Sequence, residues 1–204
     1  AFHAAELGRA ESLRRAGKTD AAVEVLKQLA ETHPDLPSVH VASGDLNRQL
    51  ENYEAAVAAY NRALEIFSAN ETDQWFVHYA RAICYERLDQ WDKAEADFRR
   101  ALELNPGHPQ VLNYLGYSLV EQQRNLDEAL EMIERAVAAS PDSGYIVDSL
   151  GWVFYRLGRY EEAVDPMERA VELLPNDSIV NDHLGDVYWM VGREREARFQ
   201  WSRA

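Results

Sequence analysis

The chain has 204 residues, of which 47% are hydrophobic and 27% charged. This composition is typical of a folded domain with its own core and excludes a disordered chain. The formal net charge is −14, with acidic residues spread along the whole length. Because proteins that bind nucleic-acid duplexes normally carry a basic patch, the charge argues against nucleic acid and against anionic membrane surfaces as partners. No stretch approaches the roughly 20 apolar residues of a membrane-spanning helix.

Two series of small residues recur in step along the chain. The first series is Ala22, Ala56, Ala94, Ala129, Ala163 and Ala197, and the second is Ala10, Gly44, Ala82, Gly116, Gly151 and Gly185. Most intervals in both series are 34 residues, with one of 38 and one of 35. A fixed period of this length indicates a solenoid of stacked helix pairs.

In chain order, the two series divide the sequence into repeats at 3–36, 37–74, 75–108, 109–143, 144–177 and 178–204. Each repeat is predicted to form two antiparallel helices, which gives about twelve helices, an all-α fold and a single solenoid over residues 3–204. Pro106, Pro141 and Pro175 should end second helices, because proline disfavours helix in the residue before it. Gly17, Gly158 and Gly192 should close first helices in the left-handed conformation.

Three features depart from a regular array. The four extra residues of the second repeat are expected at 68–73, a polar segment, and the one extra residue of the fourth repeat at 122–125. Pro166 falls inside a second helix, where a kink or a loosened first turn is expected. The chain begins inside a helix without Met and its last repeat is truncated, so we expect a fragment of a longer protein.

The residue types within each period match a known repeat. The fifth repeat carries the pattern at Val147, Leu150, Gly151, Phe154, Ala163, Met167, Ala170 and Pro175. This resembles the tetratricopeptide repeat (TPR) family over essentially the whole chain. The resemblance implies a right-handed superhelical solenoid of antiparallel helix pairs that acts as a protein–protein interaction scaffold or adaptor.

A narrower resemblance covers residues 109–204. The runs 113–117 (NYLGY), 148–160 (DSLGWVFYRLGRY) and 183–187 (HLGDV) are similar to those of large TPR proteins of the proteobacterial envelope, several of them lipoproteins. One such relative is an adaptor that brings substrates to a carboxyl-terminal processing protease. The resemblance favours a periplasmic or outer-membrane-associated location. The cytoplasm stays the alternative, since a single cysteine, Cys84, fits either compartment.

The family implies that the first helix of each repeat lines a concave groove. Carried over by position, the first two repeats supply a charged surface of Glu11, Arg14, Arg15, Asp45, Arg48 and Gln49, and the later repeats supply aromatic residues. The predicted peptide-binding groove comprises Phe76, Tyr79, Arg87, Asn113, Tyr117, Asp148, Trp152, Tyr155, Arg156, Asp182, Asp186 and Trp189. Tyr and Trp are enriched at binding hot spots, although some of these rings could simply pack between neighbouring helices.

The family's binders of C-terminal EEVD-type chaperone tails use Lys and Asn at the fifth and ninth repeat positions. The fifth positions here include Leu7, Val41 and Tyr79, so such a tail is not expected as a partner. Two alternatives stay open: self-assembly of copies through the end repeats, or an accessory repeat module of a larger enzyme.

Signs of catalysis are missing from the sequence. There is no Gly-rich phosphate loop and no HExxH motif. The six histidines, among them His33, His40, His78 and His108, are interpreted as structural, and Cys84 as a small buried hydrophobic residue. We therefore predict a protein that is not an enzyme, with no catalytic residues, no metal and no cofactor, that binds a protein or peptide.

Overall fold

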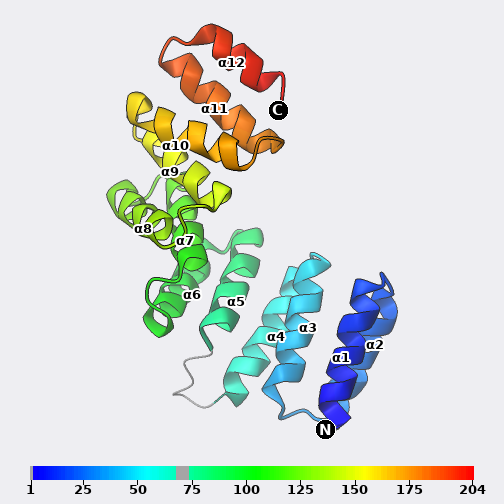
Figure 1. The fold of residues 1–204 in the computed structure, drawn as a ribbon. Coiled ribbons are helices and arrows are strands. Elements are labelled where there is room, and N and C mark those ends of the chain that lie inside the picture. The colour runs from blue at the N-terminus through cyan, green and yellow to red at the C-terminus, as the bar shows by residue number, and fades with distance from the viewer. Residues whose placement is uncertain (1, 68–73) are drawn as a thin grey trace. The chain divides into compact units, whose positions relative to one another are not determined.

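The computed structural model describes residues 2–67 and 74–204 (Figure 1). Within these ranges the chain forms twelve α-helices and no strand, which confirms the all-α prediction. The helices are α1 (Phe2–Arg15), α2 (Thr19–Thr32), α3 (Pro37–Gln49), α4 (Tyr53–Ile66), α5 (Trp75–Arg87), α6 (Trp91–Leu104), α7 (Pro109–Glu121), α8 (Leu126–Ala139), α9 (Gly144–Arg156), α10 (Tyr160–Leu173), α11 (Ser178–Met190) and α12 (Glu194–Trp201).

The helices form two compact units, unit 1 up to Pro106 and unit 2 from Gly107 onward. In unit 1, α1 pairs with α2, α3 with α4 and α5 with α6, and the first helices α1, α3 and α5 are neighbours (Figure 1). Unit 2 repeats this arrangement with α7 to α12, its first helices being α7, α9 and α11. Each unit therefore presents one face made of first helices, where the sequence placed the groove.

Most turns inside a repeat contain one left-handed residue. Gly17, Gly158 and Gly192 have φ of 71°, 72° and 80°, as predicted, and Glu51 and Asp89 take the same conformation at the corresponding turns. The fourth repeat has the longer linker expected at 122–125, since α7 ends at Glu121 and α8 begins at Leu126. The predicted insertion at 68–73 lies outside the described residues.

The prolines behave as the sequence predicts at the ends of second helices. Helices α6, α8 and α10 end at Leu104, Ala139 and Leu173, two residues before their prolines. Pro166 lies inside α10, which continues through it as one helix from Tyr160 to Leu173.

The small residues of the two series lie where paired helices touch. A Cβ added at Gly151 would lie 2.5 Å from Cγ of Met167, and one at Gly44 would lie 2.5 Å from the ring of Tyr60. Tyr60 and Met167 are fully buried, so each glycine makes room for a large core side chain. Cys84 is also buried, as predicted, and burial raises the pKa of its thiol to about 11.

None of the helices in the described residues is both long enough and apolar enough to cross a bilayer.

Candidate functional site

The twelve predicted groove residues all lie on first helices. Nine belong to unit 2: Asn113 and Tyr117 on α7, Asp148, Trp152, Tyr155 and Arg156 on α9, and Asp182, Asp186 and Trp189 on α11. Three belong to unit 1, namely Phe76, Tyr79 and Arg87 on α5.

The centre of the unit 2 face is a stack of three rings, which we call the aromatic stack. Trp152 and Tyr155 are three residues apart on α9 and therefore share a side of the helix. Their ring centroids are 4.8 Å apart, with an interplanar angle of 9°. Trp152 also stacks on His183 of α11, with centroids 4.2 Å apart and an angle of 15°. The stack thus joins two neighbouring first helices.

A third first helix reaches the same stack through a carboxylate. The indole Nε1 of Trp152 donates a hydrogen bond of 2.8 Å to Glu121 Oε1, at the end of α7. The same oxygen accepts from Arg156 Nη1 at 3.0 Å, and the Arg156 guanidinium lies 6.0 Å from the centroid of the Trp152 ring. Trp152 is therefore held by contacts from α7, α9 and α11, which fix the position of its ring.

His183 also pairs with a buried carboxylate. Its Nδ1 lies 3.0 Å from Oδ2 of Asp148, a residue that is only 6% exposed. Burial lowers the pKa of His183, but the hydrogen bond and charge of Asp148 outweigh it, and Asp182 and Asp186 add to the effect. The net pKa of His183 is raised, so the pair favours the protonated imidazolium.

Two further carboxylates lie beside the stack on α11. Asp186 accepts a hydrogen bond of 3.2 Å from the Trp201 Nε1. Burial raises the pKa of Asp186 against the lowering effect of that bond, and the charge of Asp182 raises it further. Asp182 is exposed, and among the described residues no hydrogen bond or ion pair neutralises it. Negative charge is therefore in excess on this side of the stack.

Other predicted groove residues lie away from the stack. Trp189 is 44% exposed and packs against Trp201 of α12, with centroids 5.6 Å apart. Asn113 is half-buried, and its Oδ1 is enclosed with no hydrogen-bond partner in the described part of the chain. In unit 1, burial raises the pKa of Tyr79, whose ring lies 6.1 Å from that of Phe98, whereas Arg87 is exposed in the last turn of α5.

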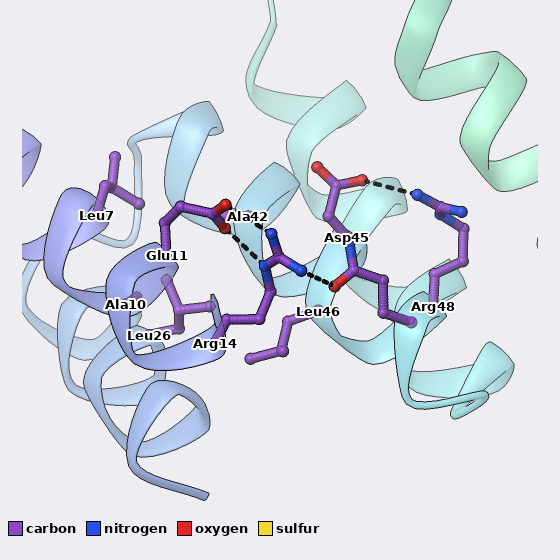
Figure 2. Close-up of a pocket in the computed structure, with 10 residues that line it drawn as sticks. Leu7, Ala10, Glu11, Arg14, Leu26, Ala42, Asp45, Leu46 and Arg48 are labelled. Atoms are coloured by element: carbon purple, nitrogen blue, oxygen red, sulfur yellow. Dashed lines mark hydrogen bonds and ion pairs between the residues drawn. The ribbon is translucent and has the colours of Figure 1, made fainter. Parts of the chain in front are cut away.

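Unit 1 carries two adjoining cavities on its first-helix face. The smaller, of about 310 Å³, lies between α1 and α3 and is drawn in Figure 2. The larger, of about 440 Å³, is mainly apolar. The smaller cavity is lined by Leu7, Ala10, Glu11, Arg14, Leu26, Ala42, Asp45, Leu46, Arg48 and Gln49, and the larger by Leu7, Pro37, Ser38, Val41, Ala42, Asp45, Phe67 and Phe76.

Of the twelve residues in the predicted peptide-binding groove, Phe76 lines one of these two cavities, and the smaller cavity is lined by five residues of the predicted charged surface: Glu11, Arg14, Asp45, Arg48 and Gln49. The sequence analysis placed the polar lining of the smaller cavity on the groove face, but it did not predict the apolar lining of the larger cavity. The available signal was the pair Leu7 and Val41, two apolar residues at successive fifth positions of first helices. The sequence also places His183 on a first helix of this face, but its stacking on Trp152 and its pairing with Asp148 were not predicted. The signal for its pairing was that Asp148 and His183 take adjacent positions, five and six, on successive first helices.

Comparison with known proteins agrees with this geometry. The family model described as the tetratricopeptide repeat matches residues 7–71, 79–144 and 121–178, which is most of the chain. The chain belongs to the tetratricopeptide repeat family. A solved TPR protein from Parabacteroides merdae superposes with a TM-score of 0.79 at 21% identity, covering 97% of this chain and 77% of that one. TPR proteins are scaffolds for protein–protein interaction, and this chain has the fold of that class.

Two bacterial relatives by sequence are longer than this chain. A TPR repeat-containing protein of Pseudomonas aeruginosa is 29% identical over 159 residues, covering 78% of this chain and 26% of the relative. A homologue of the lipoprotein NlpI from Haemophilus influenzae is 32% identical over 110 residues, covering 52% of this chain and 34% of the relative. The chain thus spans about a quarter to a third of these relatives and resembles proteobacterial TPR lipoproteins.

Proposed function

We propose that this TPR chain is a non-catalytic scaffold or adaptor that holds a segment of a partner polypeptide on the first-helix face of unit 2. The family supports the general role, because TPR proteins bind protein or peptide partners. The observation that carries the specific proposal is the aromatic stack with uncompensated carboxylates beside it. By similarity to bacterial lipoproteins, we place this role in the bacterial cell envelope.

The chemistry of the stack indicates the kind of segment it would bind. Trp152 and Tyr155 stack on each other but stay partly exposed, and the remaining apolar surface of the two rings suits an apolar or aromatic anchor. Asp148, Asp182 and Asp186 together carry more negative charge than the single imidazolium of His183 beside them, so a cation of the partner placed next to Asp182 and Asp186 would balance the excess. We therefore expect a partner segment that carries an aromatic or aliphatic side chain and at least one Lys or Arg.

The competing interpretation is that the stack only joins helices. The bond from Trp152 to Glu121 and the stacking on His183 do connect α7, α9 and α11. Such contacts contribute to the stability of unit 2 whether or not a partner binds. The two interpretations differ in what happens to binding when the rings are removed and the fold persists.

The test uses the whole chain and terminally blocked peptides that contain one Trp and one Arg, studied by isothermal titration calorimetry. The double substitution Trp152→Ala with Tyr155→Ala should weaken binding by about thirtyfold or more, since losing a hot-spot anchor costs about 2 kcal/mol. Phe199→Ala removes an exposed ring from α12 and is the matched control, which should bind as the parent does.

Circular dichroism at the temperature of the titration must show near-normal helix content in the double mutant. A folded double mutant that binds these peptides as tightly as the parent would show that the groove assignment is wrong. The alternative of self-assembly makes a different prediction: the mass in solution, measured by light scattering, would rise with concentration in the absence of peptide.

A further inference from the structure

The two cavities of unit 1 form a second potential binding surface, composed entirely of residues outside unit 2. They share Leu7, Ala42 and Asp45 in their walls, so they adjoin along α1 and α3. The larger cavity has Leu7, Val41 and Phe76 in its apolar lining and a volume of about 440 Å³. A cavity of that size accommodates a leucine or phenylalanine side chain of a bound peptide.

Most of the charges around the smaller cavity are satisfied within the protein. Arg14 donates to both carboxylate oxygens of Glu11, through Nε at 2.7 Å and Nη2 at 2.6 Å, and its Nη1 donates to Gln49 at 2.9 Å. Arg15 adds a bond of 2.7 Å to Glu11. These bonds lower the pKa of Glu11 to about 2. Figure 2 shows Glu11 and Arg14 from α1 facing Asp45 and Arg48 from α3.

The second carboxylate is also engaged. Asp45 Oδ1 accepts a hydrogen bond of 2.7 Å from the hydroxyl of Tyr60, a fully buried residue. Glu11 is paired with Arg14 and Arg15, and Asp45 keeps its negative charge but lies near Arg14 and Arg48, so both carboxylates have arginines beside them. The cavity therefore differs from the carboxylates beside the aromatic stack.

Arg48 is the charged group whose hydrogen-bonding capacity is least used. Its Nε lies 3.4 Å from the Tyr60 oxygen and its Nη2 lies 3.9 Å from Asp45, both longer than ordinary hydrogen bonds. The side chain is 32% exposed, so the guanidinium is partly shielded from water yet can be reached from the cavity. A guanidinium with free donors in such a place favours a carboxylate in bidentate geometry.

We propose that unit 1 binds a second class of peptide, one that carries an apolar side chain for the larger cavity and an acidic side chain for Arg48. This site goes beyond the proposed function, because it prefers the opposite charge and shares no residue with the aromatic stack. A chain with both sites would hold two different segments, from one partner or from two.

The test uses the whole chain and acetylated, amidated hexapeptides with one Leu and one Glu separated by one to four residues. Blocked ends exclude recognition of a terminal carboxylate. The titrations use about 0.15 M salt, at which the overall negative charge of the protein is screened beyond about 8 Å. The peptide with at least one of these spacings between Leu and Glu should bind. Replacing its Glu by Gln should weaken binding about tenfold or more, and replacing it by Lys should weaken it further. Absence of binding at every spacing, or tighter binding of the Lys peptide, would overturn the proposal.

Two pairs of variants locate the site. Arg48→Gln should remove the preference for Glu over Gln, whereas Arg62→Gln, at an exposed arginine of α4, should keep it. Ser38→Trp adds a ring at the exposed rim of the larger cavity and should block the Leu peptides, while Glu24→Trp on exposed α2 surface should not. Retention of the Glu preference in Arg48→Gln, or of Leu-peptide binding in Ser38→Trp, would overturn the assignment.

The failure of this proposal can be separated from the failure of the proposed function. The double substitution Trp152→Ala with Tyr155→Ala should leave binding of the acidic peptide unchanged within twofold. If that double mutant lost the acidic peptide as well as the basic one, both peptides would bind at the stack and the unit 1 site would be excluded.

Discussion

Units 1 and 2 are each built from three helix pairs, yet their first-helix faces carry different chemistry. In unit 1 this face has two cavities and a partly engaged arginine. In unit 2 it has stacked rings and excess carboxylate. Small residues occupy the same repeat positions in both units, because they are required where paired helices touch. The repeated small residues therefore specify the contact between the two helices of a repeat, whereas the exposed residues of the first helices can differ from one unit to the other.

The residue that packs against the glycine of a repeat can also contact the first-helix face. The large residue packed on the glycine of a repeat is Tyr60 in the second repeat and Met167 in the fifth. Tyr60 carries a hydroxyl, which bonds Asp45 at the cavity, whereas Met167 has no polar group to extend. The last repeat resembles the second in this respect, since Trp201 packs on Gly185 and donates a hydrogen bond to Asp186. Replacing this core residue should therefore alter the first-helix face in the second and last repeats and leave it unchanged in the fifth.

The largest expected effect concerns a buried polar network of unit 1. Asp97 is 6% exposed and accepts bonds of 2.6 and 2.7 Å from Arg81 and one of 2.8 Å from His78. Asp97→Ala would leave the half-buried Arg81 charge without its carboxylate, which should lower the free energy of unfolding by about 3–5 kcal/mol. Urea unfolding measures the loss, and hydrogen exchange should place it in α5 and α6.

The control for this change is Glu103→Ala, which removes an exposed partner of Arg100 on the same helix and should cost less than about 1 kcal/mol. Asp148→Ala in unit 2 should cost less than Asp97→Ala, because among the described residues Asp148 pairs with His183 alone, whereas Asp97 pairs with His78 and Arg81. An Asp97→Ala loss below 1 kcal/mol, or lost protection mainly in α9 to α12, would contradict the network's role.

The second prediction concerns close packing in unit 2. Gly151→Leu forces a side chain against Met167, whose Cγ would lie 2.5 Å from the new Cβ, so overpacking should cost about 1–3 kcal/mol. Because repeats contact only their neighbours, protection from hydrogen exchange should fall in unit 2 and persist in unit 1. Gly8→Leu is the matched control: a Cβ there has no atom within 4 Å, so the change should be neutral or stabilising by up to about 1 kcal/mol. Uniform loss of protection through both units would show that damage is not local.

The sequence predicted the fold well because the fold depends on a pattern that repeats six times. The helix pairs, the left-handed turns at Gly17, Gly158 and Gly192 and the extra residue at 122–125 all follow from local rules of spacing and backbone conformation. Glu51 and Asp89 take left-handed turns without glycine, so residue type alone could not have placed those turns.

The sites were harder to predict, because contacts between repeats depend on side-chain reach rather than on period. The sequence placed Trp152 and Tyr155 on one face correctly, but the stacking on His183 and the bond to Glu121 each join residues more than 30 positions apart. The pairing of Glu11 with Arg14 and Arg15 follows from local spacing on one helix, but the bond from Tyr60 to Asp45 depends on how α4 packs on α3, and the cavity at Arg48 was therefore not predicted. Whether a charged side chain can pair with a ligand depends on the contacts it makes with other helices in the folded unit.

The third prediction tests the charge contrast between the two faces. Asp182→Asn removes an exposed, unneutralised charge beside the aromatic stack, so peptides with Trp and Arg should bind about two- to fivefold more weakly. The acidic peptide proposed for unit 1 should be unaffected. Asp165→Asn, at an exposed position of α10, is the control and should change neither titration. Equal weakening by both substitutions would mean that net charge, not the site, attracts the basic peptide.

The smallest expected effect is the pH dependence of the His183–Asp148 pair in unit 2. The pKa of His183 is raised in the folded state, mainly because Asp148 outweighs burial, above an unfolded value of about 6.5. The stabilisation is therefore fully present below pH 6.5 and is lost as the pH rises through the folded pKa. Unfolding free energies of the parent and of His183→Gln, measured from pH 5.5 to 9, should differ most at the acid end.

Asp148→Asn provides the control for that titration. Without the carboxylate, burial should dominate and lower the pKa of His183, so the stability contributed by His183 should rise with pH instead of falling. His183→Gln and Asp148→Asn both lose part of the contact between α9 and α11. That loss does not depend on pH, so it does not affect the slope of the unfolding free energy against pH. Parallel pH profiles for the parent and His183→Gln would show that the charge interaction between His183 and Asp148 does not stabilise the fold. His183 would then contribute only through its stacking on Trp152.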